Sequence, residues 1–142
     1  MTKVVKLKTG SATEEQGSYS RLVMVDKLIF ISNTAGRHPV TKEMPEDAAG
    51  QLLQIFDNLE RALTSVGSCL ADIVSYKVYV PDPDDFPAVA KIIGDKFKGI
   101  DPALTVTSSP LMAPYYKVEM EATAYHGASV ADTEYINISD QD

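Results

Sequence analysis

Hydrophobic and polar positions change their spacing several times along the chain, and each change indicates a different element. Two runs of β-forming residues, 22–25 and 28–34, flank Asp26 and Lys27, which predicts a β-hairpin. From 46 to 66 the apolar residues instead recur every three or four positions. This spacing predicts an amphipathic helix with one buried face.

The second half of the chain repeats the alternation of strand and helix. Alternation over 73–80 predicts a strand with Ser75 and Lys77 on one side and, on the other side, Val74, Tyr76, Val78 and Val80. A second helix is expected after a cap at Asp84 or Asp85. Its inward stripe is expected to comprise Phe86, Val89, Ile92 or Ile93, and Phe97. The runs 103–108 and 117–126 predict two more strands, and 3–8 is a candidate for an additional first strand.

These elements follow the order β-β-α-β-α-β-β, an α+β arrangement in one domain over residues 1–126. Right-handed crossovers would place both helices on one face of a mixed sheet. The other face would lack a helical cover, and because its residues are not uniformly polar we expect another subunit to bury it. The acidic tail, 127–142, is expected either to be disordered or to add an edge strand through EYINIS.

Composition and charge argue against several classes of function. The 142-residue chain has a formal net charge of −7 and no run of Lys and Arg interleaved with aromatics, which opposes nucleic-acid binding. Two histidines, without HxxxH or CxxC spacing, give little basis for a metal site. The only cysteine, Cys69, permits no intramolecular disulfide and is expected to be a small buried packing residue. No signal peptide or membrane span is recognisable, so a cytoplasmic location is expected.

Two loop segments carry polar groups that the framework does not obviously require. GSYSR contributes Tyr19 and Arg21, and SNTAGR, at the end of a strand, contributes Asn33, Thr34 and Arg37. Strand ends often carry binding residues, but taken alone a turn and an ordinary loop are the simpler interpretations.

A third polar segment is the strand KVEMEATAY, in which Val118 and Met120 alternate with Lys117, Glu119 and Glu121. A carboxylate on a strand that lines a partly dry cleft would have a raised pKa and could activate water. The alternative is a pair of solvated or Lys-paired glutamates on an exposed face. Periodicity alone does not separate the two.

Five segments, taken in order, resemble the Rid family of reactive intermediate imine deaminases, also called YjgF. They are GSYS, ISNTAG, FDNLERALTSVGSCLADIVSYKVYVPDPDDFPAV, DPALT and KVEMEATA, and the resemblance covers residues 17–124. It implies a chorismate-mutase-like fold assembled as a homotrimeric barrel, with pockets between subunits. It also implies hydrolysis of enamines and imines to a 2-oxo acid and ammonia, with no cofactor.

The same resemblance implies roles for individual residues. Glu119 stands at the family position thought to orient water, and Tyr19 at the position of a pocket tyrosine. The family motif PAR[ST] is PALT here, so Leu104 replaces the arginine that holds the substrate carboxylate, whereas Thr105 agrees. Leucine cannot form the charge-assisted hydrogen bonds of a guanidinium, worth about 1.5–3 kcal/mol each. Leu104 and Glu119 are expected on adjacent strands.

Two functions remain open on this basis. One is a cofactor-free hydrolase with altered substrate choice, acting on an enamine, imine or aminomuconate-type metabolite. Arg37 is then the first candidate to hold a substrate carboxylate and Arg21 the second, with Asn33, Thr34, Leu104 and Thr105 as further binding residues. The other is a noncatalytic metabolite-binding or regulatory trimer. RNA cleavage, a further activity attached to the family, is disfavoured by the net charge of −7.

Overall fold

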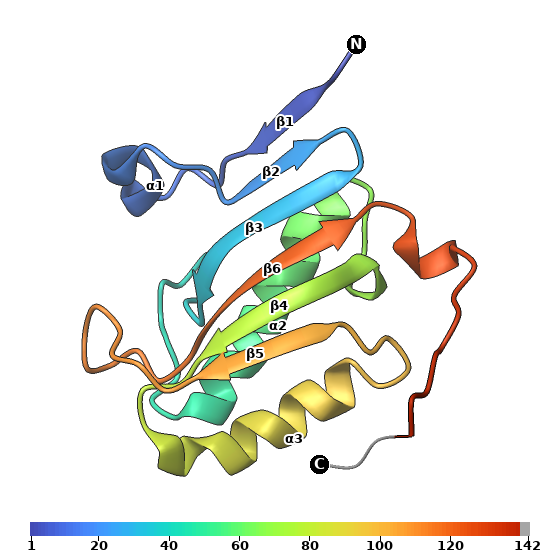
Figure 1. Ribbon diagram of the computed structural model, residues 1–142. Helices are drawn as coiled ribbons and strands as arrows, with labels where there is room; N and C mark the ends of the chain where they lie inside the picture. The colour runs from blue at the N-terminus through green and yellow to red at the C-terminus, as the bar shows by residue number, and fades with distance from the viewer. Residues whose placement is uncertain (140–142) are drawn as a thin grey trace.

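The computed structural model describes residues 1–139, and a six-stranded sheet forms its centre (Figure 1). The spatial order of the strands is β1-β2-β3-β6-β4-β5, and neighbours pair antiparallel except β4 and β5, which are parallel. The strands are β1 (Val4–Leu7), β2 (Leu22–Val25), β3 (Leu28–Ala35), β4 (Ile73–Tyr79), β5 (Ala103–Thr107) and β6 (Glu119–Tyr125).

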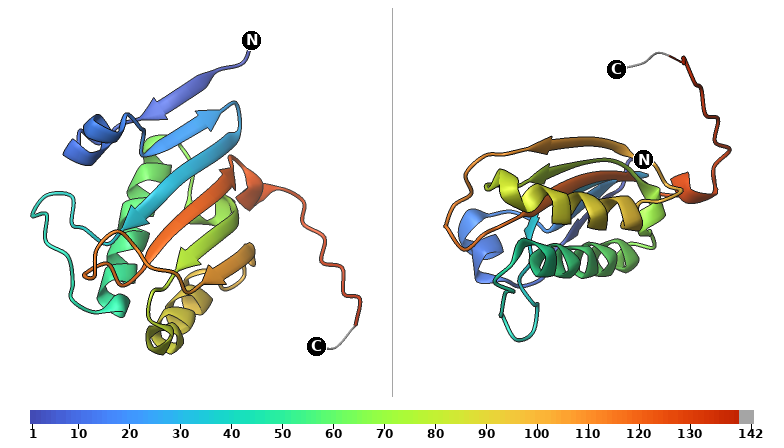
Figure 2. Two further views of the ribbon diagram at one scale, coloured as in Figure 1. Left: turned by 60° about the vertical axis from the view of Figure 1, so that its left-hand side comes forward. Right: turned by 90° about the horizontal axis from the view of Figure 1, so that it is seen from below.

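Two helices, α2 (Ala48–Ser65) and α3 (Phe86–Lys96), cover one face of this sheet (Figure 2). Each helix crosses between strands that run in the same direction, and right-handed crossovers bring both to the same side. Aromatic rings join the two layers: the Phe97 centroid lies 5.5 Å from that of Phe56 and 4.3 Å from that of Tyr76. The expected order of elements is confirmed, including the additional first strand.

A short helix that the hydrophobic pattern does not predict, α1 (Ala12–Gly17), precedes the hairpin. The Ser11 hydroxyl accepts a hydrogen bond from the backbone N of Glu14 at 3.2 Å. The buried Glu14 carboxylate in turn accepts one from the backbone N of Thr9 at 2.9 Å. A Ser-x-x-Glu spacing is a known signal for a helix start, so the sequence does carry a cue for α1.

Two expectations for residues 69–74 are wrong. Val74 is 43% exposed, because the pairing of β4 with β6 shifts register between Ile73 and Ser75. This irregularity makes Ile73 a core residue in place of Val74. Cys69 is exposed, in the turn between α2 and β4, and is not a buried packing residue.

The start of α3 also differs from the expectation. A short turn, Pro83–Asp85, comes first, and the Asp82 carboxylate caps it by accepting a hydrogen bond from the backbone N of Asp84 at 2.9 Å. Asp85 makes no side-chain capping bond. Phe86 is 41% exposed rather than part of the inward stripe, because it is the first residue of α3 and lies outside the packed helix face.

The opposite face of the sheet carries no helix (Figure 2). Leu28, Phe30 and Tyr125 lie on this open face with 44%, 48% and 43% of their surface exposed. A depression of ≈ 290 Å³ lies beside Phe30 and is also lined by Lys77 and Thr105. Burial of the open face by another subunit stays a prediction.

Beyond β6 the chain forms one helical turn, Ala128–Val130, and then extends to residue 139. No strand forms over 134–139, so the edge-strand alternative is not realised within this chain. The Tyr135 hydroxyl donates a hydrogen bond to the Asp101 carboxylate at 3.0 Å. Among the described residues, no helix is both long and apolar enough to cross a membrane.

Candidate active site

Glu119 begins β6, between β3 and β4, and Asn33 of β3 donates a hydrogen bond from Nδ2 to its Oε1 at 2.7 Å. A register shift between Ile31 and Thr34 makes this contact possible. Ile31 is buried under the helices, so strict alternation would bury Asn33 as well. The irregularity instead buries Thr34 and turns Asn33 outward, beside Glu119.

The half-buried Glu119 carboxyl is the most suitable base in this region. Burial raises its pKa above the usual value, and the positive charge of Arg21 offsets part of that rise. Within residues 1–139, Asn33 is its only hydrogen-bond donor. One carboxylate oxygen is therefore held in place while the other stays available to a water molecule.

Arg21 and Tyr19 lie close to Asn33. Together with Asn33 and Glu119 they form a cluster that we call the Glu119 corner. The Arg21 Nη2 donates to the Asn33 carbonyl at 2.9 Å, and the guanidinium carbon lies 5.7 Å from the centre of the Tyr19 ring. The Arg21 Nε is buried without a hydrogen-bond partner in the described part of the chain. Gly17 makes room for the ring, since a Cβ there would lie 2.8 Å from Tyr19 Cδ1.

Arg37 lies apart from the Glu119 corner. Its Nη1 donates to the Lys42 carbonyl at 2.8 Å, and its own carbonyl accepts a hydrogen bond from Asn58 of α2 at 3.0 Å. Both bonds belong to the loop that follows β3. The structure therefore places Arg21, and not Arg37, next to the carboxylate.

Leu104 and Thr105 also lie apart from Glu119 within one chain. The expectation of adjacent strands is wrong, because β4 lies between β5 and β6. Thr105 lines the depression on the open face. Leu104 is the pairing partner of the buried Tyr76 in β4, but its own side chain is 45% exposed at the edge of the sheet.

Of the predicted site residues, two groups therefore lie at different sides of the sheet, Tyr19, Arg21 and Asn33 near Glu119, and Leu104 and Thr105 on β5. Arg37 lies in its own loop, and Thr34 is buried with its hydroxyl bonded to the Ser32 carbonyl, so it is not exposed as a binding residue.

Comparison with known proteins identifies the family. Residues 9–126 match the family described as Endoribonuclease L-PSP. This chain belongs to the Rid (YjgF) family. A RutC family protein of Aquifex aeolicus (strain VF5) is 31% identical over 121 residues, which cover 84% of this chain and 97% of that protein. A 2-iminobutanoate/2-iminopropanoate deaminase of Rattus norvegicus is 29% identical over 122 residues, covering 85% and 89% of the two chains.

A solved structure confirms the Rid fold. A member of the YjgF family from Mycobacterium tuberculosis superimposes with a TM-score of 0.79 at 30% identity, covering 87% of this chain and 99% of that one. The α+β class, the mixed sheet and the two helices on one face agree with this relationship.

Gln51 supports the Rid site indirectly and was missed by the sequence analysis. It is fully buried in α2, where its amide nitrogen donates to the carbonyls of Pro45 and Tyr115 at 2.8 and 2.9 Å. Its oxygen accepts from the backbone N of Lys117 at 2.9 Å, two residues before Glu119. These bonds fix the chain as it enters β6. A polar residue on the apolar stripe of the helix was the available signal.

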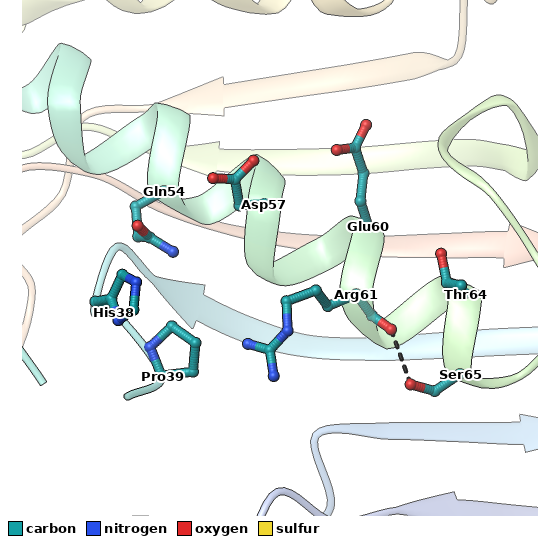
Figure 3. Close-up of a pocket in the computed structure, with 8 residues that line it drawn as sticks. All are labelled: His38, Pro39, Gln54, Asp57, Glu60, Arg61, Thr64 and Ser65. Carbon is teal, nitrogen blue, oxygen red and sulfur yellow. Dashed lines mark hydrogen bonds between the residues drawn. The ribbon is translucent and has the colours of Figure 1, made fainter. Parts of the chain in front are cut away.

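A second, larger cleft of ≈ 550 Å³ runs along the outer side of α2 in this Rid protein (Figure 3). His38 and Pro39 of the loop form one wall, and Arg61 reaches between that loop and the helix. The carboxylates of Asp57 and Glu60 point away from the Arg61 guanidinium. None of the residues predicted to form the site lines this cleft. Across residues 1–139, no three His, Cys, Asp or Glu side chains form a metal-binding group.

Proposed function

We propose that this chain is a cofactor-free hydrolase that releases ammonia from a small enamine, imine or aminomuconate-type compound. The observation that carries this proposal is the Glu119 corner, a carboxylate with a raised pKa, one oxygen held by Asn33 and a cation nearby. A carboxylate of this kind is suited to general-base chemistry. The relative named as a 2-iminobutanoate/2-iminopropanoate deaminase supports the same class of reaction.

In the proposed reaction, Glu119 accepts a proton from water while the water oxygen bonds to the imine carbon. The resulting adduct takes that proton on nitrogen to give a carbinolamine, and the C–N bond then breaks as the hydroxyl proton is transferred to the leaving nitrogen. One imine and one water therefore give one carbonyl compound and one ammonia. An enamine first gains a proton on carbon to become the imine. Tyr19 would donate to or position the substrate through its phenolic hydroxyl.

We place Arg21 ahead of Arg37 as the cation that holds a negatively charged substrate group. Arg21 acts electrostatically on Glu119, and its buried Nε has no partner among residues 1–139, whereas Arg37 is hydrogen-bonded within its own loop. Leu104 would make an apolar contact where Rid relatives with the PAR[ST] motif place a carboxylate-binding arginine. Substrate choice would therefore differ from that of an ordinary 2-imino acid deaminase.

The proposed active unit is a homotrimer with the site between subunits. Leu104 and Thr105 belong to β5 at one side of the sheet, while Tyr19 and Arg21 precede β2, toward the other side. A head-to-tail contact, repeated around a closed ring, would bring the β5 side of one copy to the β2 side of the next. It would unite the two groups of residues and cover the exposed Leu28, Phe30 and Tyr125.

RNA is not proposed as a substrate, although the matched family is described as an endoribonuclease. A net charge of −7 and a sequence pI of ≈ 4.7 oppose binding to a phosphate backbone.

Glu119→Gln tests the proposal, with Glu15→Gln, at an exposed glutamate of α1, as the control. A panel of imines, enamines and aminomuconate-type compounds is assayed for ammonia release, and ligand affinity is measured by calorimetry. Glu119→Gln is expected to lower turnover by about 10²–10⁴-fold with nearly unchanged affinity, because it removes only the base. Glu15→Gln is expected to remain active.

A wild-type protein that consumes none of these compounds faster than Glu119→Gln would contradict the hydrolase proposal. If it nevertheless bound one of them, the noncatalytic metabolite-binding alternative would take its place. Sedimentation velocity tests the assembly separately, and a monomer at micromolar concentration would exclude the intersubunit site.

A further inference from the structure

Residues 127–142 lie beyond the family match, which ends at residue 126. The match with the Aquifex aeolicus relative uses 84% of this chain and already covers 97% of that protein. The match with the Mycobacterium tuberculosis structure uses 87% of this chain and covers 99% of that one. What these relatives share with the chain therefore does not account for this segment. We call residues 131–139, the described part that follows the last helical turn, the arm.

The arm starts from a fixed point on the fold. Asp72 is buried, and its carboxylate accepts hydrogen bonds from Ser68 Oγ at 2.6 Å and from the backbone N of Ser129 at 2.8 Å. Further along, the Tyr135 hydroxyl is bonded to Asp101, two residues before β5 begins. The first contact fixes the chain beside the start of β4, and the second holds the arm near the start of β5.

The arm exposes large apolar side chains. Ile136 and Ile138 are 79% and 75% exposed, and they alternate with Asn137 as in a strand with one apolar side. The right panel of Figure 2 shows the arm running past the sheet on its uncovered side, away from the helices. Neither isoleucine belongs to the core of this chain.

The opposite edge of the sheet is complementary to the arm. β1 is the terminal strand there, and Val4, 52% exposed, lies between the exposed Lys3 and Lys6. Neither lysine forms an ion pair within residues 1–139. The arm contains Asp132 and Glu134, and the sequence continues with Asp140 and Asp142, with no Lys or Arg after residue 126. The arm, which is acidic and apolar, thus points outward near β5. At the opposite edge of the sheet, the basic strand β1 has no partner on its outer side in the described chain.

We propose that the arm lies along the β1 edge of a second copy of this chain and adds a strand to its sheet. Ile136 and Ile138 would pack near Val4, and the acidic residues would lie near Lys3 and Lys6. The contact cannot form within one chain, because β1 and β5 are at opposite ends of the sheet. This inference rests on the proposed head-to-tail assembly, which brings the β5 side of one copy to the β1–β2 side of the next.

Site-specific cross-linking tests the contact directly. Ile136→Cys and Val4→Cys are introduced into separate, differently tagged copies, both carrying Cys69→Ser, and the two copies are co-expressed and oxidised. A covalent dimer that contains both tags is expected. The control pairs Ile136→Cys with Leu53→Cys, a residue of α2 that is 49% exposed, and no such dimer is expected there.

Sedimentation of the same samples separates the possible failures. A trimer that gives no more cross-linking for Val4→Cys than for Leu53→Cys would overturn the arm contact and leave the proposed assembly intact. A monomer would overturn both.

A second pair of variants measures the contribution of the contact to assembly. Ile136→Asp combined with Ile138→Asp is expected to raise the concentration at which half the protein is assembled by roughly tenfold, because it charges the apolar side of the arm. Asn137→Asp adds a charge on the other side and is expected to change this midpoint less than about twofold. Equal midpoints for the two variants, with unchanged circular dichroism, would contradict the proposal.

Discussion

The Glu119 corner and the β5 edge carry the two groups of predicted site residues, and a single chain completes only the first. At the corner, Asn33 donates a hydrogen bond to Glu119, and Arg21 bonds to the Asn33 carbonyl and lies over the Tyr19 ring, all within one subunit. At the β5 edge, Leu104 is half exposed and makes no contact with the carboxylate. In the proposed assembly, one copy would organise the base, whereas selection of the substrate would depend on what lies against the β5 edge.

The largest effect on folding stability is expected at Asp72, which directly precedes β4 and holds Ser129 of the turn that leads into the arm. Burial alone would raise its pKa, but hydrogen bonds from Ser68 and Ser129 outweigh burial and lower it to about 2, from an ordinary 3.8. The folded state therefore binds this proton more weakly than the unfolded state. The stabilisation, about 2 kcal/mol, is present above pH 4 and is lost as the pH falls toward 2.

Urea unfolding at pH 7 and pH 3 checks this expectation. Asp72→Asn should lower the free energy of unfolding by about 2 kcal/mol at pH 7 and by less at pH 3. Asp95→Asn, which removes only an exposed pair with Lys91, should cost less than about 0.5 kcal/mol. An equal loss for Asp72→Asn at both pH values would show that its charge is not the cause.

A smaller effect is expected at the Glu119 corner itself. Asn33→Ala removes the amide that holds Oε1, and kcat is expected to fall roughly tenfold, with KM little changed, because the base loses its orientation. Asn58→Ala, whose amide bonds the loop after β3, is the control. A loss confined to KM would mean that Asn33 binds substrate instead of positioning Glu119.

The β5 edge is tested by Leu104→Arg. The wild type is expected to hydrolyse simple 2-imino acids weakly, and a guanidinium at this position is expected to raise kcat/KM for them by several-fold up to about tenfold. For an imine without a carboxylate, Leu104→Arg should leave kcat/KM unchanged. This control separates carboxylate binding from an effect on every substrate. Wild-type rates equal to those of a Rid protein with the complete PAR[ST] motif would contradict the role given to Leu104.

The smallest expected change concerns pH dependence. Arg21 lowers the pKa of Glu119, so Arg21→Gln should raise that pKa further and move the acid limb of kcat/KM to higher pH. Arg37→Gln should leave the limb in place, because Arg37 bonds to Lys42 away from the carboxylate. A shift for Arg37→Gln and none for Arg21→Gln would reverse their proposed order.

Most of the helices and strands could be predicted from the spacing of apolar residues along the chain. The hairpin at Asp26, the two helices and the alternation of β6 were readable because apolar spacing reports directly which side of an element is buried. Local irregularities escaped this reasoning. Val74 turned outward and Asn33 reached Glu119 through register shifts, and a shift in strand pairing depends on both strands.

For this protein, the sequence by itself determined the α+β class, the Rid family and the residue types of the site. Tertiary structure decided which of those residues meet. It placed Arg21 beside Glu119 and Arg37 in a separate loop, and it inserted β4 between the strands of Leu104 and Glu119. The physical reason is that strand order and register are set by long-range pairing and by packing of the two helices, whereas periodicity along the chain describes each element alone.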